Sequence, residues 1–179
     1  MKRATTWMKA ALVVPVMAAG MVVGTGATSQ ADDDVVCRGT IGTRVIDGNV
    51  VVPRNATCRL VRMVVDGDVK AGSGAVLKVE GARIDGNIQT SGARQVFIAG
   101  NHGVGTRVDG NIQLKNGTRG GYVRLAVVKG DIQLFSNRGR FDVRRNIVDG
   151  NLQCKGNKPA PTGAKNRVDG NKENQCRRF

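Results

Sequence analysis

The stretch Val108-Asp109-Gly110-Asn111-Ile112 is one of seven copies of a short signature in this chain of 179 residues. Each copy has an aliphatic residue, an Asp (replaced once by Lys), a Gly and an Asn or Asp. The Asp position falls at Asp47, Asp66, Asp85, Asp109, Lys129, Asp149 and Asp169. Successive copies are 19, 19, 24, 20, 20 and 20 residues apart. A repeat of about 20 residues with β-type composition is typical of a solenoid, in which every repeat stacks on the one before it.

Apolar and polar residues alternate along each signature. The residue before the Asp is a β-branched aliphatic in every copy, and the third and fifth residues after it are mostly apolar. The fourth residue after it is polar in most copies: Lys70, Gln89, Gln113, Gln133, Gln153 and Glu173. Alternation with period 2 predicts a β-strand with one buried face. In this register the Asp and Asn point outward. The Gly falls in an inward slot, which indicates that the chain bends or packs too closely there for a side chain.

A second strand is expected in each turn, at residues 77–79, 96–98, 122–125 and 141–143, after corners rich in Gly and Asn. No sustained helical period separates the repeats. We therefore predict an all-β fold, a single-stranded right-handed parallel β-helix of about seven coils of roughly 20 residues; the handedness follows from the preference of parallel crossovers. An antiparallel barrel or sandwich is the main alternative.

Two irregularities in the repeat make further predictions. The spacing of 24 residues indicates an insertion around residues 99–106, which is expected to leave the rod as a loop. In the seventh copy Lys172 and Asn174 replace the inward apolar residues, so the core pattern stops there. A polar last coil is typical of a capped solenoid end, which blunts the open strand edge.

The N-terminal residues read as a secretory signal peptide. Lys2, Arg3 and Lys9 precede an apolar run at residues 10–23, and Ser29-Gln30-Ala31 offers a cleavage site. We predict a signal peptide at 1–31, a short acidic segment at 32–36 and a β-helix domain with disulfide-linked end coils at 37–179. The protein is then secreted, extracellular or associated with the cell envelope, without a membrane span once the signal is removed. A transmembrane anchor is the alternative, but the apolar run is shorter than the roughly 18–20 residues needed.

The four cysteines predict two disulfides, because an even number of cysteines is typical of exported chains. Cys37 and Cys58 are 21 residues apart and Cys154 and Cys176 are 22 apart, about one repeat in each case. On stacked coils such residues are neighbours. The other pairings would span most of the array, far beyond the roughly 7 Å allowed between bridged Cα atoms. We expect one bridge at each end. A zinc site is the alternative, but no CxxC motif is present and the single histidine, His102, is distant in sequence.

Stacking turns each signature position into a row of like residues about 4.8 Å apart. The Asn position predicts an amide ladder between coils, which we interpret as structural. The Asp position places like charges next to one another. Arg83, Arg107 and Arg167 lie two residues before three of the aspartates, on the same strand face, and can neutralise them. Calcium binding is the alternative for this row, although neither an EF-hand nor a calcium-binding nonapeptide occurs. We expect no metal and no cofactor.

The chain is strongly basic, with 28 Lys and Arg against 14 Asp and Glu. Without the three cations of the predicted signal peptide, the formal charge falls from +14 to +11. An exported cationic protein suggests anionic partners such as a cell-wall polymer or an acidic polysaccharide. The bland interpretation is a soluble protein that happens to be basic. We expect the candidate residues to gather on the face of the second strand and its corners: Arg62, Arg94, Arg119, Arg124, Arg138, Arg140, Arg144 and Arg145.

Other functions have weaker support. The single Trp, Trp7, lies in the predicted signal peptide, and one Tyr and four Phe remain, so we expect no sequence-specific nucleic-acid binding. Stacked aspartates would meet the roughly 5–10 Å carboxylate separation of a glycosidase in any case, so that geometry is uninformative. No serine or cysteine nucleophile motif is present. We therefore predict no catalytic residues, with a polysaccharide lyase or hydrolase as the low-ranked alternative.

The repeats Val108-Asp109-Gly110-Asn111-Ile112 and Val128-Lys129-Gly130-Asp131-Ile132 resemble those of bactofilins, over roughly residues 37–176. The resemblance implies a right-handed β-helix and, because bactofilins are intracellular polymer formers, assembly into filaments. Bactofilins lack the signal peptide and disulfides predicted here. The chain also resembles small secreted repeat proteins of unknown role, which implies a fold and no activity.

The preferred interpretation is a non-catalytic, secreted structural or binding β-solenoid that contacts anionic extracellular or cell-envelope polymers through a basic face. A self-assembling envelope filament is the second candidate and a carbohydrate-active β-helix enzyme is the third. The sequence makes no prediction of the oligomeric state.

Overall fold

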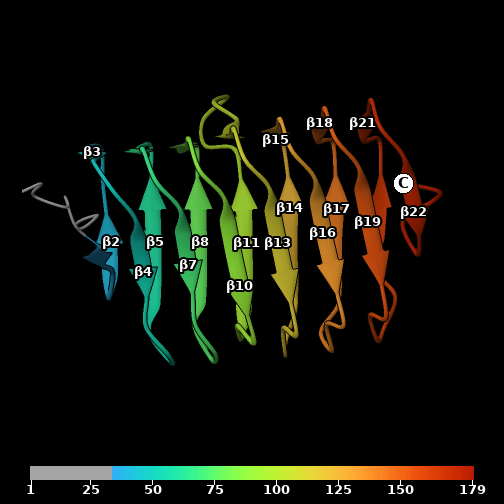
Figure 1. Ribbon diagram of the computed structural model, residues 1–179, viewed down its shortest axis with the longest axis horizontal. Helices are drawn as coiled ribbons and strands as arrows, with labels where there is room; N and C mark the ends of the chain where they lie inside the picture. The colour runs from blue at the N-terminus through green and yellow to red at the C-terminus, as the bar shows by residue number, and fades with distance from the viewer. Residues whose placement is uncertain (1–33) are drawn as a thin grey trace, which may run out of the picture.

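The computed structural model describes residues 34–179, which form a rod of 22 short strands with no helix. The strands lie in three sheets that run the length of the rod (Figure 1). The signal peptide predicted at residues 1–31 lies outside the described residues.

Each sheet collects one strand from every coil. Sheet A holds β1 (Val35–Val36), β4 (Val50–Val52), β7 (Val69–Ala71), β10 (Ile88–Ser91), β13 (Ile112–Lys115), β16 (Ile132–Phe135), β19 (Leu152–Lys155) and β22 (Lys172–Asn174). Sheet B holds β2 (Gly39–Ile41), β5 (Thr57–Val61), β8 (Val76–Glu80), β11 (Gln95–Ala99), β14 (Gly121–Arg124), β17 (Phe141–Arg144) and β20 (Thr162–Ala164). Sheet C holds β3 (Val45–Ile46), β6 (Val64–Val65), β9 (Arg83–Ile84), β12 (Thr106–Val108), β15 (Ala126–Val128), β18 (Ile147–Val148) and β21 (Arg167–Val168).

All pairings between neighbouring strands of the sheets are parallel and keep the repeat in register. In sheet A, for example, Ile88 pairs with Ile112, and Ile112 pairs with Ile132. The protein is therefore a parallel β-solenoid of about seven coils, coil 1 running from β1 to β3 and coil 7 from β19 to β21. The parallel β-helix prediction is confirmed, and the antiparallel barrel or sandwich is wrong.

The signature is a corner rather than part of one continuous strand. The aliphatic residue before the Asp ends a strand of sheet C, and the apolar residue after the Asn begins a strand of sheet A. Each coil thus has three strands instead of the two predicted. The sheet C strands are only two or three residues long, which is too short to show an alternation of their own.

The signature glycine is required by close packing between coils. The Gly67 nitrogen donates a 3.0 Å hydrogen bond to the Gly48 oxygen of the coil before it. A Cβ atom at Gly67 would lie 2.6 Å from that same oxygen and 2.6 Å from Oδ1 of Asn49. Since the contact is with backbone, a side chain could not be accommodated by rotation. The prediction that the chain packs too closely here is confirmed, although the glycine sits at a corner.

The core is a narrow stack of aliphatic side chains contributed by all three sheets. Equivalent positions lie directly above one another and are fully buried, such as Ile88, Ile112, Ile132 and Leu152 in sheet A. Phe141 is the one aromatic residue among the buried side chains of residues 34–179. A core of this shape leaves function to the outer faces and corners.

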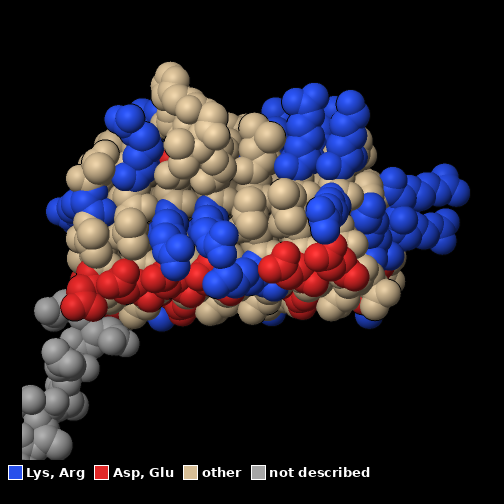
Figure 2. Space-filling model, turned by 90° about the horizontal axis from the view of Figure 1, so that it is seen from above, with Lys and Arg blue, Asp and Glu red and all other residues tan. Residues whose placement is uncertain are grey.

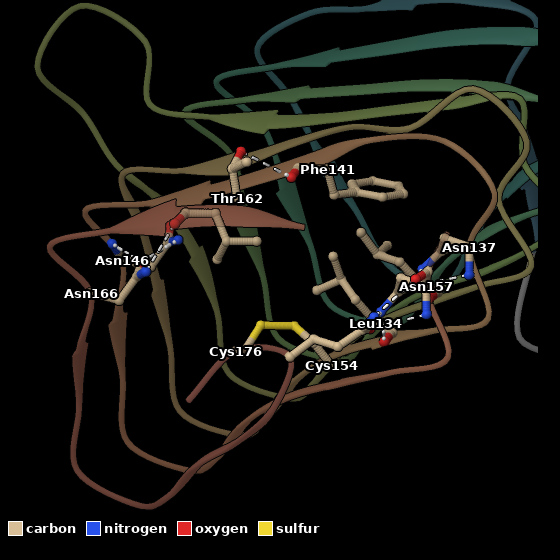
Figure 3. The surroundings of a disulfide bond; sticks show 12 residues. Leu134, Asn137, Phe141, Asn146, Cys154, Asn157, Thr162, Asn166 and Cys176 are labelled. Atoms are coloured by element: carbon tan, nitrogen blue, oxygen red, sulfur yellow. Dashed lines mark hydrogen bonds between the residues drawn. A yellow bond between two sulfur atoms is a disulfide. The ribbon is translucent and has the colours of Figure 1, made fainter. Parts of the chain in front are cut away.

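The two other corners of the later coils are held by buried asparagines. At the corner between sheets A and B, Oδ1 of Asn137 accepts the Gly117 N–H at 2.7 Å, and Oδ1 of Asn157 accepts the Asn137 N–H at 3.0 Å. At the corner between sheets B and C, Asn146 and Asn166 repeat this arrangement (Figure 3). Earlier coils carry small residues there, such as Ala75.

The disulfides join Cys37 to Cys58 in the first two coils and Cys154 to Cys176 at the last, as the spacing predicted. Figure 3 shows the second bridge among the buried asparagines. All four cysteines are buried. Buried bridges at both ends tie the terminal coils to their neighbours.

The C-terminal end is capped by polar groups and by the tail. Lys172 donates from Nζ to the Asn166 oxygen at 3.0 Å, so the first of the two predicted polar replacements makes a specific contact. Gln175 exchanges hydrogen bonds with Asn157, and Phe179 lies against Gly163. The expected capped last coil is confirmed.

The 24-residue spacing produces the predicted loop. Residues 100–105, between β11 and β12, leave the rod beside sheet C and form the protruding loop of Figure 1. An antiparallel bridge pairs Asn101 with Val104, and the two residues between them have positive φ.

Candidate anion-binding surface

The signature Asn or Asp forms the expected ladder along the corner between sheets C and A. Oδ1 of Asn49 accepts the Asp68 backbone N–H at 2.8 Å, and Oδ1 of Asp68 accepts that of Asn87 at 2.8 Å. The pattern continues to Asn171. These side chains join neighbouring coils through hydrogen bonds, which agrees with the interpretation of the ladder as structural. Partial burial raises the pKa of Asp68, but hydrogen bonds from Asn87 and the nearby Lys70 outweigh this and leave the pKa below its usual value.

The signature aspartates lie in a row along the same corner, and three of the six, Asp85, Asp109 and Asp169, pair with neighbouring cations. Arg83 contacts Asp85 at 2.7 Å and Asp109 at 3.2 Å. Arg107 and Lys129 also pair with Asp109, at 2.9 and 2.8 Å. Hydrogen bonds from Lys129 and Arg107 lower the pKa of Asp109. Figure 2 shows this acidic band along one edge of the face, with Lys and Arg beside it.

The eight predicted anion-binding arginines fall into two clusters on opposite edges of sheet B, with Arg62 apart in coil 2. The first basic cluster lies at the corner between sheets A and B and consists of Arg94, Arg119, Arg138 and Arg140, together with Lys158. The second basic cluster lies at the corner between sheets B and C and consists of Arg124, Arg144 and Arg145, together with Lys165. Lys158 and Lys165, both of coil 7, were not among the predicted residues, because the prediction named arginines alone.

Backbone stacking brings the first basic cluster together. The Arg119 nitrogen donates to the Arg94 oxygen at 2.9 Å, and the Lys158 nitrogen donates to the Asn137 oxygen at 2.8 Å. Arg138 and Lys158 line an open hollow of about 480 Å³ with the hydroxyl-bearing residues Thr118 and Ser136. Within residues 34–179 no carboxylate lies within 4.0 Å of the charged groups of this cluster.

Half of the second basic cluster is engaged by an aspartate. Asp142 lies between Arg124, at 2.6 Å, and Arg144. Partial burial raises the pKa of Asp142, but the hydrogen bonds from both arginines outweigh it and leave the pKa below its usual value. Arg145 and Lys165 make no ion pair with any carboxylate of the described residues. All four cations line a hollow of about 440 Å³.

Sheet B also carries an outward aromatic pair that the sequence did not reveal. The ring centroids of Phe97 and Tyr122 are 5.0 Å apart, and Arg124 lies over the Tyr122 ring at 4.7 Å. The pair is formed across the insertion, where the regular period fails. The cation over the ring ties the second basic cluster to the face of sheet B.

Residues 34–179 hold no group of three or more His, Cys, Asp or Glu placed to ligate a metal ion. Nor does this part hold a helix with the length and apolar character needed to cross a bilayer.

The fold and the site define the chain as a parallel β-solenoid repeat protein with two disulfides and a basic surface on its later coils. Disulfides are typical of proteins that fold in an oxidising compartment. No protein-family model, no curated protein and no solved structure matches the chain.

Proposed function

We propose that the protein is a non-catalytic, secreted binding protein that holds an anionic polymer, such as a cell-wall phosphate polymer or an acidic polysaccharide, against sheet B of its later coils. The observation that carries the proposal is the unequal pairing of the cations. Those of sheet C are matched with carboxylates, whereas those of the first basic cluster have none.

Stacking fixes the spacing of these unmatched cations. Arg138 and Lys158 occupy equivalent positions on consecutive coils, which are about 4.8 Å apart, and Arg119 lies one residue beyond the equivalent Thr118 of the coil before them. A polymer with a negative charge in every unit can contact several such cations at once. Arginine also suits phosphate and carboxylate groups, because its planar guanidinium donates two parallel hydrogen bonds. The gain grows with every coil that carries a cation, since each contact with the same chain adds to the last.

The test compares two triple variants with equal loss of charge. The first removes Arg119, Arg138 and Lys158 from the first basic cluster, each replaced by Ser. The matched control removes Arg83, Arg107 and Arg167 from sheet C in the same way. We expect the first variant to elute from immobilised heparin and from a polyphosphate resin at clearly lower salt than the control. Wild-type retention should fall steeply with salt, because exposed charges are screened.

Equal elution of the two variants would show that retention follows net charge alone and would overturn the proposal. Retention of the wild type that does not change between 0.1 and 1 M salt would do the same. Sedimentation at rising protein concentration measures self-assembly, which the likeness to bactofilins implies. Release of reducing sugar from an acidic polysaccharide measures the enzymatic alternative in the same samples.

A further inference from the structure

An apolar groove lies beside the second basic cluster, at the one place where the repeat carries an insertion. The loop 100–105 of coil 4 forms one side, and Leu125, Val127 and Ile147 of coils 5 and 6 form the other. The groove has a volume of about 390 Å³. Val104, Leu125 and Ile147 are 54%, 50% and 43% exposed, and they are three of the five large apolar side chains that are exposed in residues 34–179.

Stacking does not require apolar residues at these positions. Ile147 pairs with Val127 on one side and with Arg167 on the other, and Val127 pairs with Arg107. The row along sheet C is aliphatic in coils 1 and 2, Arg in coils 3 and 4, aliphatic again in the two coils after the loop, and Arg in coil 7. The fold accepts either a cation or an aliphatic residue here, so stacking alone leaves the choice open at Val127 and Ile147.

Leu125 shows the same substitution in a second row. Its nitrogen donates to the Arg144 oxygen, and the Arg145 nitrogen donates to the Ala164 oxygen, so Leu125, Arg145 and Lys165 occupy equivalent positions. Leu125 has a φ of 54°, a left-handed conformation that is uncommon for residues other than Gly. An exposed leucine in this conformation gives the isolated protein no packing advantage over the Arg and Lys of the next coils.

The groove is continuous with the hollow of the second basic cluster. Leu125 and Arg145 line both, and Lys165 lies beyond them. Arg145 and Lys165 have no carboxylate partner among the described residues, and Arg145 lines the apolar groove as well as the hollow that it shares with Lys165. An occupant that complements both parts must have a hydrocarbon portion joined to an anionic group.

We propose that this composite site binds an anionic lipid, with one alkyl chain in the groove beneath the loop and the phosphate head on Arg145 and Lys165. The volume is at the lower end of the roughly 300–1,000 Å³ typical of small-molecule sites, which suits a single chain. Burial of the alkyl methylenes favours entry of the chain into the groove, and the guanidinium and ammonium donate charge-assisted hydrogen bonds to the head. The proposal is independent of polymer binding, because the first basic cluster has no part in it.

The probe is monomeric dodecyl phosphate, and binding is measured by calorimetry and by chemical-shift changes of backbone amides. We expect saturable binding with shifts centred on residues 100–105, 125 and 147. Dodecyl maltoside, dodecyltrimethylammonium and inorganic phosphate each lack one of the two features and should bind at least tenfold more weakly. Equal binding of dodecyl maltoside, or full competition by inorganic phosphate, would overturn the composite site.

The variants place residues that neighbouring coils already carry. Leu125→Lys introduces the residue of coil 7, and Ile147→Arg also introduces the residue of coil 7, so both should fold. Each should weaken dodecyl phosphate binding at least tenfold. Val104→Ser, in the exposed loop, is a third variant that leaves the coils untouched and should weaken binding several-fold. The matched control is Val45→Arg, in the same row of sheet C but in coil 1. If the groove variants bind like this control, the proposal is wrong.

Discussion

Oδ1 of Asn146 lies 3.0 Å from the backbone nitrogen of Ala126, one coil earlier, while its Nδ2 donates to the Val123 oxygen at 2.9 Å. One amide therefore satisfies a buried donor and a buried acceptor that have no access to water. The corner between sheets B and C is thereby closed in coil 6, and Asn166 closes it in the same way in coil 7.

The first prediction concerns this amide. Asn146→Ala leaves the Ala126 N–H and the Val123 carbonyl unsatisfied, each at a cost of roughly 1–3 kcal/mol. We expect the free energy of unfolding in urea to fall by about 2–4 kcal/mol. Asn111→Ala is the matched control, because Asn111 makes an equivalent bond to the next coil at an exposed site where water can replace it. A similar loss in both variants would contradict the role given to burial.

The second prediction concerns the signature glycine. A Cβ atom at Gly110 would lie 2.6 Å from Oδ1 of Asn87 and 2.7 Å from the Gly86 oxygen. Gly110→Ala therefore forces two coils apart, and overpacking of this kind costs about 1–3 kcal/mol. Thermal and urea unfolding both measure the loss. Gly42→Ala is the control, since nothing lies within 4 Å of its Cβ, and its stability should stay within about 0.5 kcal/mol of the wild type.

The third prediction concerns the disulfides. The two bridges close segments of similar length, with separations of 21 and 22 residues, so each should contribute about 3 kcal/mol in the chain-entropy treatment. One variant replaces both Cys37 and Cys58 by alanine, and the other replaces both Cys154 and Cys176. Each should lower the free energy of unfolding by a comparable amount. The bridges lie at opposite ends, so the two losses should add. A fourfold-substituted protein as stable as either pair variant would refute this.

The fourth prediction concerns pH. The pKa values of Asp68, Glu80, Asp109 and Asp142 are all lowered in the folded protein, with Arg59 acting on Glu80 through a hydrogen bond. Groups with depressed pKa values stabilise the fold above their unfolded pKa, about 4, and lose that contribution as the pH falls through the folded value. The melting temperature should therefore be nearly constant from pH 7 to 5 and decrease below about pH 4.

The control for the pH experiment is Asp142→Asn, which removes one titrating group. Its melting temperature should be lower than that of the wild type at pH 7 and should decline less on acidification. A melting temperature that rises as the pH falls from 4 to 2 would show the opposite linkage and would contradict the prediction.

The sequence predicted the features that depend on the repeat. Once residues one period apart are neighbours, the pairing of Cys37 with Cys58 and the neutralisation of Asp109 by Arg107 follow from counting. The loop at 100–105 follows from the single long spacing. These predictions share one physical basis, the parallel in-register stacking of coils.

Features that break or hide the period could not be predicted. The sheet C strands, such as β9, are only two or three residues long. The sequence therefore predicted each of them as part of the sheet A strand that follows it. Asn146 and Asn166 have no counterpart in earlier coils, where Ala82 and Ala126 fill the same corner. Phe97 and Tyr122 lie on either side of the insertion, so a fixed spacing does not align them. The apolar groove beside the second basic cluster is lined in part by that same insertion.

The in-register stacking of Ile88, Ile112, Ile132 and Leu152 has a consequence for the length of the molecule. The core surface by which each inner coil packs on the coil before it matches the surface on which the next coil packs. The disulfide-linked coils lie only at the two ends. A gene segment that encodes one inner coil could be duplicated or lost between the two disulfides, and the same end coils would still cap the rod. The length of the rod therefore changes in whole steps of about 4.8 Å.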